Sequence, residues 1–133
     1  MKQEILSQLR ADLLALHDDW ELLMTQEAMA DDPKFLEKVA GDIQQLDADA
    51  TLALSSKKLK DQAEVVHFAL STPWGAPFIG ETTLIDAARS YDATNPESPL
   101  KHLLTDFLRY GHKKHVPLFH VLDEITEELE SYR

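Results

Sequence analysis

Cysteine is absent from the 133-residue chain, so no disulfide, thiol nucleophile or cysteine-based metal site is available to it. Basic residues are also scarce, because 13 lysines and arginines stand against 24 aspartates and glutamates, a formal net charge of -11. Nucleic acid and anionic lipid both bind to large basic surfaces, so this balance argues against direct binding to either. It permits binding to a basic protein surface, although acidity alone also keeps a small protein in solution.

Two apolar patterns are missing as well. No stretch sustains the period-two alternation that is typical of half-buried strands. The longest charge-free run, Val65 to Gly80, is too short and too interrupted by proline and glycine to span a bilayer. At the N-terminus, Glu4, Arg10 and Asp12 interrupt what would be the apolar core of an export signal. We therefore expect a cytoplasmic protein that makes no membrane contact.

Apolar residues recur instead at three- and four-residue steps, which predicts amphipathic helices. The first predicted helix runs from about Lys2 to Met29, with four carboxylates on the face opposite its apolar stripe: Asp12, Asp18, Asp19 and Glu27. Asp32 followed by Pro33 is a helix-start signal, and it predicts a second helix that ends near Leu46. A short element over 48–54 and a basic turn over 57–60 follow.

The second half of the chain shows the same start signals. Asp61 is predicted to cap a helix whose inward residues are Val65, Val66, Ala69 and Leu70. Thr82 or Thr83 is predicted to cap a helix that ends near Tyr91. Ser98 and Pro99 open a helix that Gly111 stops, and Pro117 opens the last one.

The segment over 71–80 contains two prolines and two glycines, yet it carries Trp74 and Phe78. We interpret it as an apolar connector between two helical subregions, 1–70 and 81–133. The prediction is a single all-α domain over 1–133, a compact bundle of about five to seven helices. A chain of this length buries enough surface to fold without a metal or a disulfide.

The segment Leu59-Lys-Asp-Gln-Ala-Glu-Val-Val-His-Phe-Ala-Leu70 resembles a short bacterial helical repeat of unknown function, which reads Leu-x-Asp-Asp-x-Glu-Val-Val-x-x-Ala-Val. Residues 31–40 resemble a degenerate second copy, thirty residues earlier. The resemblance covers about a fifth of the chain. It implies helical packing and a binding role, and it brings no catalytic residues.

Acidic residues are concentrated between Asp18 and Ala50, where ten carboxylates stand against two lysines. We therefore expect a non-enzymatic protein that acts by binding another protein. The most concrete version is an inhibitor, immunity-type or anti-defence protein whose carboxylates occupy the basic surface of a nucleic-acid-handling enzyme. The predicted partner contacts are Asp18, Asp19, Asp31, Asp32, Glu127 and Glu128, with Trp74 and Phe78 as apolar anchors.

Three alternatives stay open. A helical adaptor would present an apolar groove around Trp74 and Phe78 to an amphipathic segment. A small metal-dependent enzyme would use the H-x2-H-x4-H-x3-E spacing of His112, His115, His120 and Glu124. A homodimer would place the basic turn from Arg109 to His115, with Lys101 nearby, on the acidic helix face of a second copy.

Catalytic motifs are weak by comparison, so we expect no enzyme and no cofactor or metal. Gly75 to Thr82 has the spacing of a phosphate-binding loop, but Glu81 stands where that loop needs lysine. His17 and Glu21 are one helical turn apart and could support acid–base chemistry. Such a pair on an exposed helix is usually an ordinary side-chain contact between neighbouring turns.

Overall fold

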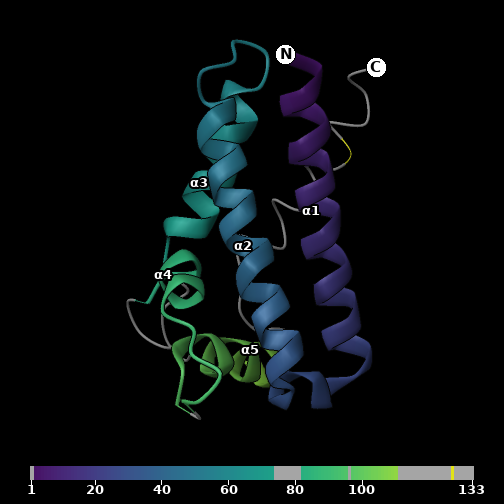
Figure 1. The fold of residues 1–133 in the computed structure, drawn as a ribbon, viewed down its shortest axis with the longest axis vertical. Coiled ribbons are helices and arrows are strands. Elements are labelled where there is room, and N and C mark those ends of the chain that lie inside the picture. Colours follow the sequence, from purple (N-terminus) through teal and green to yellow (C-terminus); the bar gives the residue numbers. More distant parts are fainter. Residues whose placement is uncertain (1, 74–81, 96, 111–126, 128–133) are drawn as a thin grey trace.

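The computed structural model describes residues 2–73, 82–95, 97–110 and 127, and every regular element within these ranges is helical (Figure 1). This confirms the predicted all-α class. In chain order the elements are α1 (Lys2–Thr25), the 3-10 helix η1 (Glu27–Asp31), α2 (Pro33–Ala53), α3 (Lys60–Ser71), α4 (Leu84–Arg89) and α5 (Pro99–Tyr110). The predicted contacts Trp74, Phe78 and Glu128 and the four predicted metal ligands of 112–124 lie outside the described residues.

The two longest helices, α1 and α2, lie side by side along the long axis of the molecule, and η1 makes the turn between them (Figure 1). They run antiparallel, because the turn is short and α2 returns along α1. Each presents one apolar stripe to the bundle. The stripe of α1 comprises Leu9, Leu13, Leu16, Trp20 and Leu23, and that of α2 includes Leu36, Val39, Ile43, Leu46 and Ala50.

Helix α2 is the centre of the fold, since α1 packs on one side of it and α3 and α4 pack on another (Figure 1). Helix α5 lies across the end of the bundle at which η1 turns, and its buried residues are Leu100, Leu103, Leu104 and Phe107. The ring centroids of Trp20 and Phe107 are 6.0 Å apart, which connects α1 to α5. The described helices thus share one apolar core.

Two of the predicted helix starts are confirmed by their hydrogen bonds. The side chain of Asp32 accepts a bond from the Lys34 backbone N–H at 3.0 Å, directly before Pro33. Thr83, rather than Thr82, caps α4 by accepting from the Asp86 N–H at 3.2 Å. Both side chains satisfy a backbone donor that the first turn of a helix leaves unpaired.

Of the other two predicted helix starts, the cap at Asp61 is wrong, whereas the start at Ser98 and Pro99 is confirmed without a side-chain cap bond. The cap position of α3 is Leu59, which makes no side-chain cap bond, and Asp61 lies within the first turn. Helix α5 does begin at Pro99, but the hydroxyl of Ser98 is buried without a hydrogen bond. An acidic residue in a first turn still favours the helix electrostatically, so sequence alone does not distinguish that position from a cap.

Two predicted boundaries also differ from the structure. Helix α1 ends at Thr25 instead of Met29, because the backbone of Gln26 turns out of the helical range (φ -134°, ψ 82°) and the chain tightens into η1. Helix α2 continues to Ala53, through the predicted separate element over 48–54. Ala50 and Ala53 are fully buried and extend the apolar stripe, so packing holds this segment in α2.

Val65 is the one predicted inward residue of α3 that the structure turns outward. Its side chain is 44% exposed, whereas Val66, Ala69 and Leu70 are fully buried. A short helix with a single covered side buries one stripe, and Val65 and Phe68 lie beside that stripe.

Candidate functional site

The described acidic contacts differ in their exposure and in their partners. Asp18 is exposed on α1, Asp31 is exposed in η1, and Glu127 is exposed. Asp32 is half-buried at the start of α2, where its side chain forms the cap. Asp31 already has a cation, since Lys101 Nζ lies 3.3 Å from its Oδ1. Lys101 is therefore paired within the chain, which weakens the predicted use of this lysine in a homodimer.

Asp12 and Asp19 lie between α1 and α2, so the prediction that they face solvent is wrong. Their exposed fractions are 9% and 3%. Each faces an aspartate of α2, since Asp49 forms a side-chain hydrogen bond with Asp12 and Asp42 forms one with Asp19. The two aspartates are seven residues apart in each helix. Because α1 and α2 run antiparallel, Asp12 faces Asp49 and Asp19 faces Asp42. We name these four residues the acidic seam: Asp12, Asp19, Asp42 and Asp49.

One pair of the acidic seam holds a proton at neutral pH. Burial, the hydrogen bond and charge of Asp49, and the charge of Asp42 together raise the pKa of Asp12 to about 8. Asp49 is 8% exposed, and Gln45 Nε2 donates to its Oδ2 at 2.9 Å. The protonated Asp12 therefore acts as the donor to Asp49, and Gln45 supplies a second donor to the same carboxylate.

The other pair is partly neutralised by Lys38. Its Nζ lies 2.6 Å from Asp19 Oδ1 and 2.9 Å from Asp42 Oδ2. Burial and the hydrogen bond to Asp42 raise the pKa of Asp19 to about 7, although Lys38 acts in the opposite direction. The two carboxylates in turn raise the pKa of Lys38. A lysine with its head group near solvent thus covers this end of the acidic seam.

A second group of carboxylates surrounds Tyr91, and we name Tyr91, Asp32, Glu37 and Asp92 the acidic patch. The Tyr91 hydroxyl donates to the Pro33 carbonyl oxygen at 3.2 Å, which brings the chain after α4 to the start of α2. Desolvation raises the pKa of Tyr91, and the charges of Glu37, Asp92 and Asp32 raise it further. Asp32 and Glu37 come from the start of α2, whereas Tyr91 and Asp92 follow α4, so no local sequence pattern unites them.

Asp92 is held in place by its own turn. Its Oδ1 accepts the Thr94 N–H at 2.9 Å and the Thr94 hydroxyl at 2.8 Å. These bonds lower the pKa of Asp92, because they favour the charged carboxylate. Asp32 is fixed as a helix cap in the same way, so two of the three carboxylates in the acidic patch have a set orientation.

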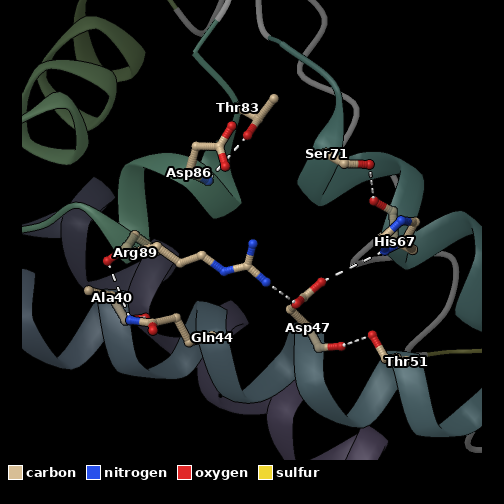
Figure 2. Close-up of polar contacts among 10 residues, drawn as sticks. Ala40, Gln44, Asp47, Thr51, His67, Ser71, Thr83, Asp86 and Arg89 are labelled. Atoms are coloured by element: carbon tan, nitrogen blue, oxygen red, sulfur yellow. Dashed lines mark hydrogen bonds and ion pairs between the residues drawn. The ribbon is translucent and has the colours of Figure 1, made fainter.

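A third polar group connects α2 to α3 and α4 (Figure 2). Asp47 Oδ2 accepts from Arg89 at 3.0 Å, and Asp47 Oδ1 lies 3.7 Å from His67 Nδ1. Gln44 Nε2 donates to the carbonyl oxygens of Ala40 and Ala88, at 3.2 and 3.3 Å. Figure 2 shows Asp47 between the side chains of Arg89 and His67, so one carboxylate of α2 serves both neighbouring helices.

His17 and Glu21 lie close together as predicted, with 3.7 Å between Nδ1 and Oε1. Asp18 joins them, and the three side chains each place a potential metal-ligand atom within 4.8 Å of the others. All three come from one turn of α1, and Asp18 and Glu21 are exposed to water. Such a group offers ligands to a cation from one side only.

None of the described helices combines the length and the apolar character needed to cross a bilayer. Comparison with protein-family models, with curated proteins and with solved structures finds no match to this chain. The resemblance of residues 59–70 to a helical repeat therefore stays a prediction, as do the apolar groove and the metal-dependent enzyme.

Proposed function

We propose that this protein is non-enzymatic and acts by binding the basic surface of another protein through the acidic patch. The supporting observation is that the Tyr91 hydroxyl bonds to Pro33 at the start of α2, where the charges of Asp32 and Glu37, together with that of Asp92, raise its pKa. Tyrosine is enriched among the residues that contribute most to binding at protein interfaces.

Within the described part of the chain, no cation neutralises the charges of the acidic patch. No ion pair joins Asp32, Glu37 or Asp92 to a lysine or arginine in the described ranges, in contrast to Asp19, Asp31 and Asp47. Unpaired carboxylates at a surface attract a basic partner over a Debye length and increase its rate of association. They also favour basic partners over acidic ones.

A nucleic-acid-handling enzyme is the partner class that fits this chemistry best, because its working surface binds phosphates and carries a surplus of lysine and arginine. The carboxylates of the acidic patch would occupy that surface in place of phosphates. In this proposal the protein is an inhibitor or an immunity-type protein, and its action needs no catalytic group.

The test is a pull-down from extract of the native cell at low and high salt, with the tagged protein and a neutralised variant. The variant combines Asp32→Asn, Glu37→Gln and Asp92→Asn. Asparagine can still cap α2 and form the turn at Thr94, so the fold should survive. We expect a basic nucleic-acid-handling protein to be retained by the wild type at low salt, and lost with high salt or with the variant.

The matched control removes the same number of charges elsewhere, through Asp61→Asn, Glu64→Gln and Asp86→Asn on α3 and α4. This control should retain the partner. Equal loss of the partner in both variants would show a dependence on total charge only. Retention by the neutralised variant at high salt would contradict the proposal and point to an apolar contact.

A further inference from the structure

The outward face of α1 combines an exposed leucine with charges of both signs. Leu14 is 44% exposed, Glu21 is 68% exposed, and Asp18 is also exposed. Arg10 lies one turn before Leu14, and the described residues offer it no ion pair. An exposed leucine alone does not indicate an interface. The charged residues on either side of Leu14 are the evidence for an interface.

Arg10 and Asp18 are placed symmetrically about Leu14, four residues before it and four after it. On a helix with a rise of 1.5 Å per residue, each lies about 6 Å along the axis from Leu14. If two copies of α1 pack antiparallel with Leu14 on the two-fold axis, residue 10 of one copy faces residue 18 of the other. Two equivalent pairs of opposite charge then form, with Glu21 of each copy within about one turn of the partner's arginine.

The parallel arrangement would do the reverse. Arg10 would face its own counterpart, and Asp18 and Glu21 would face theirs, so each contact would join like charges. The charge pattern thus selects the antiparallel pairing. Ala11, one turn before Leu14 and also exposed, is small enough to let the two backbones approach.

We propose that the outward face of α1 binds a second copy of this chain, in an antiparallel two-fold dimer centred on Leu14. The contact involves one helix from each copy, so it is small and its dissociation constant should be on the order of tens of micromolar. Helix α2 separates α1 from α4 (Figure 1), so the dimer does not require the acidic patch and the inference does not rest on the proposed function.

Sedimentation velocity over about a hundredfold range of concentration is the first test. We expect the wild type to change from monomer to dimer across this range, and Leu14→Glu to stay monomeric because two carboxylates would meet on the axis. The control is Leu52→Glu, at a side chain that is 60% exposed on α2, and it should dimerise like the wild type. A wild type that stays monomeric at every concentration would overturn the proposal and leave this face to a different protein.

The charge pairing has a test of its own. Arg10→Asp and Asp18→Arg should each weaken the dimer at least tenfold, because each places like charges in both symmetric contacts. A mixture of the two variants should form a heterodimer, since residue 10 of each copy then faces an opposite charge at residue 18 of the other. Failure of the mixture to dimerise, with both variants folded by circular dichroism, would refute the antiparallel register.

Disulfide trapping checks the register directly, because the natural chain has no cysteine. Leu14→Cys should cross-link to itself under mild oxidation, as its two copies meet on the axis. Thr25→Cys should not, since its two copies would lie about 33 Å apart along the helices. Cross-linking at both positions would indicate a parallel pair and contradict the proposal.

Discussion

The two sides of α2 treat the same residue type in opposite ways. Toward α1, Asp42 and Asp49 meet further aspartates, and among the described residues one cation, Lys38, reaches one of the two pairs. Toward α3 and α4, Asp47 meets Arg89 and His67. On the first side, raised pKa values allow the buried aspartates Asp12 and Asp19 to hold protons. On the second side, Asp47 is paired with the opposite charge of Arg89. The sequence of α2 does not reveal this difference, because the side chains of the neighbouring helix determine the environment of each aspartate.

The difference sets how each side responds to its surroundings. Ionisation of the acidic seam opposes folding, because the unfolded chain releases these protons more easily than the folded one. On the other side of α2, the ion pair between Asp47 and Arg89 favours folding. The predictions below test this contrast, in order of decreasing effect on the free energy of unfolding.

The largest expected effect is a loss of stability with rising pH. The folded pKa values of Asp12 and Asp19, about 8 and about 7, lie above the ordinary value of 3.8. Their contribution to stability is therefore complete below about pH 4 and is lost as the pH rises through 7 and 8. We expect the free energy of unfolding, measured with urea, to fall by several kcal/mol between pH 5 and pH 8, on the order of 6 kcal/mol if both groups contribute fully.

Asp12→Asn provides the matched variant, because the amide can donate to Asp49 without ionising. This variant should be more stable than the wild type at pH 8, and its free energy of unfolding should fall less between pH 5 and pH 8. A free energy of unfolding that rises with pH over this interval, or an equal decline in the variant, would contradict a proton held in the acidic seam.

The next effect is the loss of the cation. Lys38→Met leaves Asp19, which is 3% exposed, beside Asp42 with no opposite charge. We expect a cost of about 2 kcal/mol at pH 8 and a smaller cost at pH 5, where Asp19 is protonated. The control is Lys60→Met, whose partner Glu64 is 55% exposed, and it should cost less than about 0.5 kcal/mol. Urea unfolding of both variants at both pH values checks this, and equal costs would be evidence against the burial argument.

The smallest effect belongs to the opposite side of α2. Arg89→Met removes the 3.0 Å contact to Asp47, but Arg89 is 59% exposed and water screens the pair. We expect a cost of about 1 kcal/mol, which should shrink in about 0.5 M salt. Thermal unfolding at two salt concentrations measures it. A cost above that of Lys38→Met would reverse the proposed ranking of the two sides.

Much of the fold could be predicted because helix periodicity and start signals are local. The starts at Pro33, Leu84 and Pro99, and most of the apolar stripes, follow from residues within one or two turns of each other. The end of α1 and the extent of α2 could not, because neighbouring helices stabilise or release those turns. Ala53, for example, belongs to α2 because it is buried there, and its burial cannot be predicted from the residues next to it in the sequence.

The site was less accessible to sequence reasoning. Sequence pattern alone places Asp12 and Asp19 on the solvent face, because charged residues are rarely buried. Their spacing of seven, matched by Asp42 and Asp49, was a visible signal that two helices share polar layers. The acidic patch had no such signal, because Glu37 and Asp92 meet only through the bond from Tyr91 to Pro33.

Helix α4 has six residues, Leu84 to Arg89, and a helix of this length does not persist in water on its own. Its attachment to α2, through Gln44 at the Ala88 carbonyl and Asp47 at Arg89, therefore decides whether it exists at all. We expect α4 to form late in folding, after α2, and its amide hydrogens to exchange before those of the α1–α2 hairpin. Tyr91 follows α4 by two residues, so the acidic patch is assembled only in this last step, and a partner bound there would slow that exchange.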